Sequence, residues 1–332
     1  MTATKHDLVG IGNAIVDIIG RCDDEFLIRH GAPKGNMRLI DADTVSTLYA
    51  AMGPAAEISG GSVANTMVVV ASLGGRAAFI GKVANDEFGR IFRHDIKTAG
   101  VTFSTAPARS GNPTARSLIL VTPDGQRTMS TFLGVSPELD DGEVDPDLIR
   151  SGEIIYLEGY LFDRPEAKAA FRQAADIAAQ AGRKVALSLS DAFCVDRHRS
   201  EFLDLVRYKI DILIANEREI TSLYQTADFD EAARRAQADT RIAALTRGEK
   251  GSTIYAAGRA PIPVAAAPVP AVIDTTGAGD LYAAGLLFGI ATGRSLETAG
   301  RLGSLAASEA IGHLGARPQQ SLAELARSRG LI

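Results

Sequence analysis

The sequence has no tryptophan, only two cysteines and no apolar run long enough to cross a membrane. Aromatic residues make up 6% of the chain, so an aromatic platform for stacking single-stranded nucleic acid is not expected. Cys22 and Cys194 lie outside any Cys or His cluster, which argues against a zinc site. The longest helix-like apolar stretch, Leu281 to Ala291, is shorter than the roughly 20 residues that span a bilayer.

An excess of basic residues is also absent. The formal net charge of the 332 residues is −5, so no global positive field attracts nucleic acid or an anionic membrane. The first residues lack the basic, apolar and small-residue order of a signal peptide. We therefore expect a cytoplasmic protein whose partner is a small molecule, not nucleic acid or a membrane.

Short apolar runs alternate with amphipathic stretches along most of the chain. The runs expected to form strands are Leu8–Gly12, Ala77–Gly81, Ile154–Leu157, Val185–Leu189, Ile212–Ala215, Ile242–Thr246 and Thr253–Ala256. The stretches expected to form helices are Ser62–Leu73, Glu87–Ala99, Pro165–Ala181, Arg199–Lys209, Asp230–Ala238, Gly279–Thr292 and Leu296–Ile311. This alternation favours a three-layer α/β core, in which helices cover both faces of a mostly parallel sheet.

Two stretches, 15–41 and 101–135, interrupt this alternation. The second contains alternating strand-like segments around Pro123-Asp124-Gly125, a turn sequence because Pro presets φ and Gly tolerates positive φ. Strands without helices between them do not easily join a parallel sheet, so we expect a small β-sheet lid over the substrate site. The nucleotide-binding core would then comprise residues 1–14, 42–100 and 136–332. An exposed lid edge could pair between subunits, which leaves both a monomer and a homodimer open.

The strongest chemical pattern is Asp274-Thr-Thr-Gly-Ala-Gly-Asp280, directly before an apolar helix. Gly277, Ala278 and Gly279 would present backbone N–H groups at a helix start, where unpaired amides and the helix dipole favour an anion such as a phosphoryl group. Asp280 could accept the proton of an attacking hydroxyl. The alternative is that Asp280 only caps the helix.

This string resembles the C-terminal signature of the ribokinase-like (PfkB) carbohydrate kinases, a family that includes adenosine kinases. The resemblance implies a ribokinase-like αβα fold with a β-lid, ATP as phosphoryl donor, Mg²⁺, Asp280 as catalytic base and an anion hole at Gly277–Gly279. It also implies that Asp274 and Thr276 could hold a monovalent cation such as K⁺.

The segment Ile58–Thr66 resembles the N-terminal signature of the same family. The resemblance implies that Gly60, Gly61 and Asn65 contact the acceptor. A further segment, Gly12–Asp17, follows the first strand, and in the family its Asp binds sugar hydroxyls. Asp17 is therefore the candidate sugar anchor, with Asn13 beside it; the alternative is a solvated Asp at a strand end.

Two more segments match the nucleotide side of the family. Asn216 and Glu219 match its N-x-x-E element, so Asn216 would orient phosphates and Glu219 would hold Mg²⁺ through water. The same spacing is also typical of a capping box at a helix start. The segment Thr246–Gly251 resembles the nucleotide loop, which makes Thr246, Gly248 and Gly251 ATP-binding candidates; alone, it would be a simple hairpin turn.

The segment Ser188–Phe193 and the long stretch 15–41 resemble adenosine kinases more than ribokinases. The resemblance implies that Phe193 packs on a purine, with Phe162 as a second aromatic wall and Leu39 closing from the lid. The alternative is that these apolar side chains belong to the core. A small residue is usual in the family where Asp191 stands, and a glycine where Ala84 stands.

The sequence thus predicts an ATP-dependent kinase that phosphorylates a CH₂OH hydroxyl of a ribosyl or sugar substrate, most simply the 5′ hydroxyl of a nucleoside such as adenosine. A ribokinase- or fructokinase-type sugar kinase is the alternative within this class. An inactive nucleotide- or sugar-binding regulator is disfavoured by the intact Asp280 pattern. A Rossmann dehydrogenase is disfavoured because Gly10-Ile-Gly12 lacks the third glycine of its motif.

Overall fold

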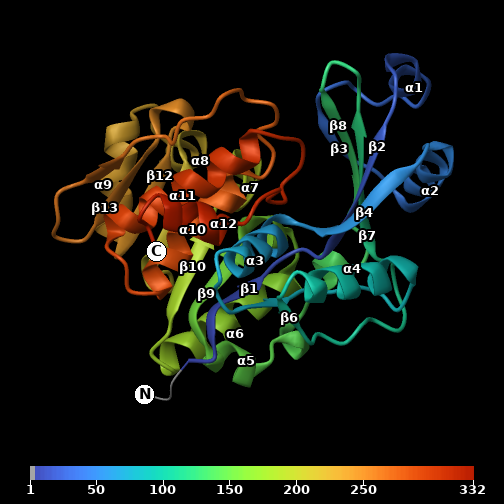
Figure 1. Cartoon of the computed structure of the whole chain (residues 1–332). Helices are drawn as coiled ribbons and strands as arrows, with labels where there is room; N and C mark the ends of the chain where they lie inside the picture. Colours follow the sequence, from blue (N-terminus) through green and yellow to red (C-terminus); the bar gives the residue numbers. More distant parts are fainter. Residues whose placement is uncertain (1–3) are drawn as a thin grey trace.

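The computed structural model describes residues 4–332 and contains two sheets of very different size (Figure 1). The large sheet has the strand order β14-β13-β12-β11-β10-β9-β1-β5-β6. Its strands are β1 (His6–Ile11), β5 (Ala77–Ile80), β6 (Thr102–Phe103), β9 (Gly152–Glu158), β10 (Lys184–Ser188), β11 (Ile212–Asn216), β12 (Ile242–Thr246), β13 (Ser252–Ala256) and β14 (Ile262–Val264). The strands from β6 to β12 pair in parallel, and β13 and β14 are antiparallel additions.

Helices cover both faces of the large sheet because its strands bury side chains on both sides. Along β9, Ile154 and Tyr156 enter one apolar cluster, and Ile155 and Leu157 enter the other. The first cluster is covered by α3 (Ser62–Ser72), α4 (Glu87–Thr98), α10 (Ala278–Ala291), α11 (Leu296–Ile311) and α12 (Leu322–Ser328). The second is covered by α5 (Pro146–Ser151), α6 (Pro165–Gln180), α7 (Ala192–Tyr208), α8 (Glu217–Tyr224) and α9 (Phe229–Asp239). The three-layer α/β fold with a mostly parallel sheet, predicted from the sequence, is confirmed.

The second sheet projects from one end of the large body (Figure 1). It has the order β3-β8-β7-β2-β4, with β2 (Ile15–Arg21), β3 (Met37–Leu39), β4 (Ala55–Gly60), β7 (Ala115–Val121) and β8 (Arg127–Phe132). The short helices α1 (Asp24–Arg29) and α2 (Ala42–Ala51) lie beside it. The second, small sheet predicted from the sequence is confirmed.

The boundaries between the two sheets differ from those expected. Strand β4 falls within 42–100, expected in the core, but pairs with β2 in the small sheet. Strand β6 falls within 101–135, expected in the lid, but pairs with β5 in the large sheet. Both differences have one cause: the strands pair with distant segments, and the local pattern does not show which sheet a short strand joins.

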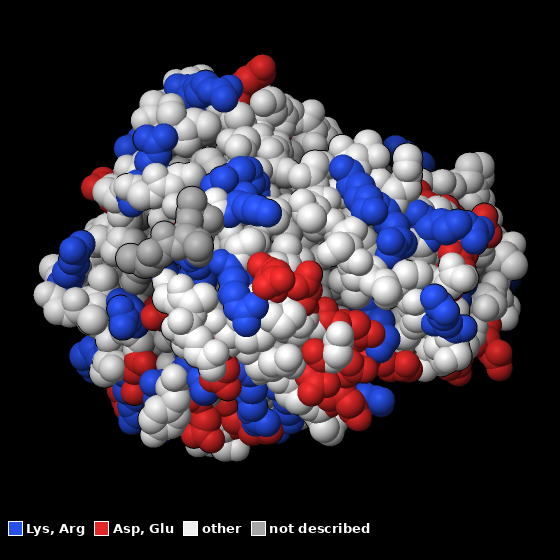
Figure 2. Space-filling view, turned by 90° about the horizontal axis from the view of Figure 1, so that it is seen from below, with Lys and Arg blue, Asp and Glu red and all other residues white. Residues whose placement is uncertain are grey.

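The remaining short helices are η1 (Ser136–Glu138), η2 (Asp141–Glu143), η3 (Gly159–Asp163) and η4 (Gly248–Lys250). Among residues 4–332, every helix is too short or insufficiently apolar to span a lipid bilayer. On the face shown in Figure 2, Lys and Arg side chains are interspersed with Asp and Glu side chains among uncharged residues. Cys22 and Cys194 are both free thiols.

Candidate active site

A cavity of about 530 Å³ opens between the two sheets. It meets the carboxyl ends of β10, β11 and β12, which is the edge where open parallel sheets bind ligands. The small sheet supplies the opposite wall. The predicted site residues that line the cavity are Asp17, Gly61, Asn65, Asn216, Glu219, Thr246, Gly248, Thr276, Gly277, Gly279 and Asp280.

The anion turn, Gly277–Asp280, lies where α10 begins. Gly277 is the residue before the helix and has φ +77°, a backbone region that favours glycine. A Cβ there would lie 2.4 Å from the Ala316 Cβ, so no other residue fits. Ala278 is the first helical residue and is not part of the cavity wall. The turn can therefore present its first amides, which lack helical partners, to an anion.

Asp280 lies in the first turn of α10 but does not cap the helix. Its side chain is half-buried and lines the cavity. The Ser62 hydroxyl donates a hydrogen bond of 2.6 Å to Asp280 Oδ1. Burial raises the pKa of Asp280 to about 7, and the nearby charges of Glu158 and Asp17 add to the rise against the opposing Ser62 hydrogen bond. An acid with this pKa can exchange a proton near neutral pH.

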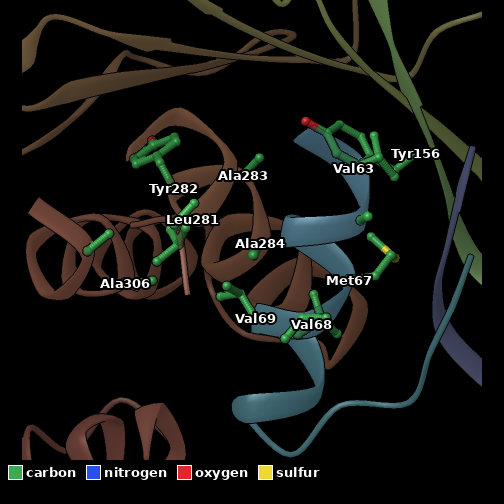
Figure 3. Close-up of a cluster of buried hydrophobic side chains, with 14 of the residues drawn as sticks. Val63, Met67, Val68, Val69, Tyr156, Leu281, Tyr282, Ala283, Ala284 and Ala306 are labelled. Carbon is green, nitrogen blue, oxygen red and sulfur yellow. The ribbon is translucent and has the colours of Figure 1, made fainter. Parts of the chain in front are cut away.

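Packing between α3 and α10 holds Ser62 beside Asp280. Figure 3 shows Val63, Met67 and Val69 of α3 in one cluster with the start of α10. Ala283 and Ala284 are small and fully buried, which lets the two helices approach closely. The Thr66 hydroxyl also donates to the Asp280 backbone carbonyl at 3.2 Å. The helix starts are thus fixed relative to each other.

Asp17 points from β2 toward the same cavity. Burial raises its pKa to about 6, although the charges of Arg317 and Arg127 favour the ionised form. Gly60 of the neighbouring strand β4 lies so close that a Cβ on it would be 2.3 Å from Asp17 Oδ2. Gly60 therefore leaves the space that the carboxylate occupies. A half-buried carboxylate on a cavity wall can accept two O–H donors, as a diol offers.

Asn13 lies away from the cavity wall. Its side-chain amide donates to Glu158 Oε1 at 2.6 Å and accepts from the Ser136 hydroxyl at 2.8 Å. Glu158 also accepts from the backbone N–H groups of Asn13 and Val63, at 2.9 and 3.0 Å. This buried carboxylate, absent from the sequence prediction, joins the end of β1 to the start of α3. Its position at the end of a buried strand was the only signal that could have found it.

The nucleotide side of the cavity is formed by the ends of β11 and β12. Asn216 and Glu219 form a capping box at the start of α8: the Asn216 side chain accepts from Glu219 N, and the Glu219 carboxylate accepts from Asn216 N, both at 3.0 Å. Both side chains still line the cavity, and burial raises the pKa of Glu219 to about 7. Asn216 and Glu219 therefore cap helix α8 and line the cavity at the same time.

The loop after β12 runs through η4 into β13. Thr246 and Gly248 line the cavity, whereas Gly251 does not. Gly251 has φ +79° and packs against the Val264 carbonyl, so its place in the structure is a tight turn. Within residues 4–332, no group of three or more His, Cys, Asp and Glu side chains could hold a metal ion.

Asp274 lies in front of the anion turn and forms an ion pair with Arg127, the first residue of β8. Its Oδ1 accepts from Thr276 N at 2.9 Å, and its Oδ2 accepts from Gly315 N at 3.0 Å. Arg127 lines the cavity and was not predicted from the sequence. This pair joins the small sheet to the loop that carries the anion turn.

The apolar residues expected beside a purine lie elsewhere. Phe162 is fully buried in the core, where its ring stacks on Phe202 with centroids 4.4 Å apart. Phe193 is 74% exposed at the start of α7, and Leu39 is 62% exposed on β3. None of the three is part of the cavity wall.

The apolar wall comes instead from one face of the small sheet. Alternate residues of its strands line the cavity, which is the period-two pattern of a strand. These residues are Ile15, Ile19, Ile58, Ile119 and Met129. The pairing of β2 with β7 places Ile19 beside Ile119. The sequence shows this alternation within each strand, but the face that meets the cavity depends on pairing between distant segments.

The sequence model of the pfkB family carbohydrate kinases matches residues 53–322 of the chain. The chain belongs to this family. A curated relative, the probable chloroplastic fructokinase-6 of Arabidopsis thaliana, is 32% identical over 277 residues, which cover 79% of this chain and 70% of the fructokinase.

Two solved structures resemble this pfkB-family kinase along nearly its whole length. The probable sugar kinase protein of Rhizobium etli is 52% identical, with a TM-score of 0.91, over 99% of this chain and 100% of the other. The adenosine kinase of Sinorhizobium meliloti is also 52% identical, with a TM-score of 0.89, over 98% and 99% of the two chains. The chain is a phosphotransferase that acts on a sugar or nucleoside hydroxyl, and the family implies ATP use and, typically, Mg²⁺.

Proposed function

We propose that this kinase transfers the γ-phosphoryl group of ATP to the 5′ hydroxyl of a nucleoside such as adenosine. The observation that carries the proposal is the shared cavity. Gly277, Gly279 and Asp280 of the anion turn and Asp17 line it together with five isoleucine or methionine side chains of the small sheet. The polar groups suit a ribosyl group, and the apolar wall suits a flat base with few hydrogen-bonding demands.

The proposed reaction uses two groups at the start of α10. Asp280 takes the proton of the acceptor hydroxyl as its oxygen attacks the γ-phosphorus, and ADP leaves. The amides at Gly277, Ala278 and Gly279 stabilise the charge on the equatorial phosphoryl oxygens. The Ser62 hydroxyl hydrogen-bonds one oxygen of Asp280, and the carboxylate lines the cavity in which the acceptor would bind.

Acceptor binding is assigned to the small sheet and the start of α3. Asp17 binds the ribose diol, since one carboxylate can accept two O–H donors. Gly60 leaves room for the Asp17 carboxylate, and Gly61 and Asn65 line the cavity beside it. Asn65 Oδ1 is buried without a hydrogen-bond partner among residues 4–332, which is consistent with a role in holding a ligand.

The donor side is assigned to Asn216, Thr246 and Gly248, with Gly251 shaping the loop that they belong to. Glu219 offers the hard oxygen ligands that Mg²⁺ prefers and would hold the ion through water, because a lone carboxylate leaves most of its coordination to water and phosphate. When bound, Mg²⁺ neutralises phosphate charge.

A sugar kinase is the second candidate, and two comparisons favour it. The Arabidopsis relative is named a fructokinase, and the Rhizobium etli protein a probable sugar kinase. A bare hexose would leave the five apolar side chains of the small-sheet wall in contact with hydroxyl groups or water, which is the physical reason to rank it second.

An acceptor panel separates the two candidates. The purified chain is incubated with ATP and Mg²⁺ and with adenosine, other nucleosides, ribose or fructose, and the products are identified by mass spectrometry. We expect kcat/KM for the best nucleoside to exceed that for fructose by about 100-fold or more. Inhibition without phosphorylation by 5′-deoxyadenosine would locate the reacting hydroxyl. Fructose or ribose as the best acceptor would contradict the proposal.

A further inference from the structure

Asp274 is the carboxylate that the family resemblance assigns to a monovalent cation, and the structure shows its oxygens already engaged. Oδ1 accepts from Thr276 N at 2.9 Å. Oδ2 accepts from Gly315 N at 3.0 Å and from the Arg127 guanidinium. A carboxylate oxygen has two lone-pair directions, so these two donors occupy both directions of Oδ2.

The ion pair between Arg127 and Asp274 is also shielded from solvent. The exposed fractions of the two side chains are 8% and 7%. Burial alone would raise the pKa of Asp274, but the hydrogen bonds from Gly315 and Thr276 and the charge of Arg127 together lower it below its ordinary value. The carboxylate is therefore ionised at neutral pH and already has a positive partner.

A K⁺ ion at this carboxylate would need several oxygen ligands in place of its hydration shell. It would also lie beside a guanidinium in a poorly solvated place, where two positive charges repel strongly. The residues present therefore do not fit a cation at Asp274 while Arg127 is in place.

We propose that Arg127 occupies the position beside Asp274 that a monovalent cation would need, and supplies that positive charge from the chain itself. Arg127 is a positioning residue: it acts on the anion turn through Asp274, whose Oδ1 receives the Thr276 amide directly before Gly277. Because Arg127 is the first residue of β8, the small sheet supplies the positive charge beside Asp274. The kinase then requires no K⁺.

Arg127 also has a donor to spare. Its Nε is buried and has no hydrogen-bond partner in the part of the chain described, residues 4–332. The side chain lines the cavity, so this buried donor lies just beneath the cavity wall. A K⁺ ion could not offer such a directional donor.

Thermal unfolding in two salts of equal ionic strength tests the proposal. One salt is KCl, and the other is N-methylglucamine chloride, whose cation is too large for a buried site. We expect the melting temperatures of the unmodified chain to agree within about 1 °C. Arg127→Met leaves the buried Asp274 without its counter-ion, so K⁺ should bind there and raise Tm by about 3 °C or more relative to the large cation.

Two controls isolate the site. Arg21→Met removes an exposed arginine from the same small sheet and should show no K⁺-specific shift. The double variant Arg127→Met/Asp274→Asn removes both charges and should lose the K⁺ response. If Arg127→Met does not fold in either salt, Arg127→Gln takes its place with the same expectation.

A K⁺-specific rise in Tm of the unmodified chain overturns the proposal, as does the absence of such a rise in the Arg127 variant. The inference rests on phosphotransfer at the anion turn and not on the acceptor. Because the melting measurement uses neither ATP nor acceptor, its outcome is independent of whether the substrate proves to be a nucleoside.

Discussion

At the scale of single residues, the site is a group of acids whose protonated forms are favoured by burial. The pKa values of Asp280, Asp17 and Glu219 are raised to about 7, 6 and 7, respectively. By linkage, each acid favours the folded state most below its unfolded pKa of about 4, and this stabilisation is lost as pH rises to 6–7. The proposed chemistry needs Asp280 ionised. Activity therefore favours the pH range in which these groups stabilise the fold least.

The first prediction concerns the pH dependence of catalysis. If ionised Asp280 is the base, kcat/KM should rise at least about tenfold per pH unit below pH 7 and level off above it, because that ratio reports the free enzyme and the roles of Asp17 and Glu219 also need their ionised forms. The measurement is kcat/KM between pH 5 and 9 at saturating Mg²⁺ and constant ionic strength. A flat profile across this range would contradict the assignment.

The second prediction concerns Ser62, whose hydroxyl stabilises the ionised form of Asp280. Ser62→Ala should move the midpoint of the pH profile upward by about one unit and lower kcat/KM at pH 7 about fivefold, because fewer molecules carry the ionised base. Ser62→Thr keeps the hydroxyl and should restore the midpoint. Ser46→Ala, on the exposed face of α2, is the matched control. If the midpoint of the pH profile does not move in Ser62→Ala, the Ser62 hydroxyl does not stabilise ionised Asp280.

At the scale of helices and strands, the site depends on how α3 meets α10. Helix α10 is buried on all sides: its nine consecutive residues from Leu281 to Gly289 are all buried. Such a helix lies inside the molecule, so its start is held by contacts on all sides. Glu158, Ser62 and Asp280 come from three different elements, and the buried packing brings them to one place.

The third prediction tests this packing. Ala284 is fully buried between the helices, so Ala284→Leu should overfill the space and reduce the free energy of unfolding by about 1–3 kcal/mol. It should also lower kcat at least tenfold, because it displaces Asp280 from Ser62. Urea unfolding and steady-state kinetics measure the two effects. The control is Ala179→Leu, on the exposed face of α6, which should change neither quantity. Unchanged kcat in a destabilised Ala284→Leu variant would separate packing from catalysis.

How much could be predicted from the sequence also depends on scale. Most predicted strands and helices of the large body formed close to their expected bounds, because their signals are local: Gly277 before α10, and apolar runs in β1 and β9. Helix α7 is an exception, because it begins at Ala192 and not at the expected Arg199, with non-helical backbone angles at His198 between its two parts. The membership of β4 in the small sheet was missed because β4 pairs with β2, about 40 residues earlier in the chain.

Single charged residues were the least predictable parts of the site. Arg127 and Arg317 line the cavity, yet neither belongs to a recognisable motif. They reach it because β8 and the segment after α11 are brought there by tertiary packing. Phe162 shows the converse: an aromatic residue beside a site segment looked like a ligand wall, but its ring completes the core beside Phe202. Residue type alone does not tell which way a side chain faces.

At the scale of the whole molecule, the two sheets form opposite walls of the cavity and contribute different groups to it. The large sheet carries the anion turn, and the small sheet carries Asp17 and the apolar wall. The chain passes between them near Gly12–Ala14, at Gly60–Gly61, between β6 and β7, and after β8. The Arg127–Asp274 pair also links them through space. A small sheet attached in this way can close over a ligand and exclude water.

The fourth prediction is that ligands bring the two sheets closer. With adenosine and a non-hydrolysable ATP analogue at about 100 times their Kd, the unfolding free energy should rise by about 2.7 kcal/mol or more. The radius of gyration, roughly 20 Å for a chain of this length, should fall by about 0.5–1 Å. Small-angle scattering and thermal unfolding measure these quantities. Stabilisation by both ligands without any compaction would mean that the sheets are already closed.

The central claim is that the Asp280 carboxylate takes the proton of the acceptor hydroxyl. The most direct measurement is single-turnover phosphoryl transfer by Asp280→Asn, with ATP affinity measured separately by calorimetry. We expect a loss of about 10³-fold or more in the transfer rate, with Kd for ATP changed less than about threefold. A transfer rate within about tenfold of the unmodified chain, at unchanged ATP affinity, would contradict it.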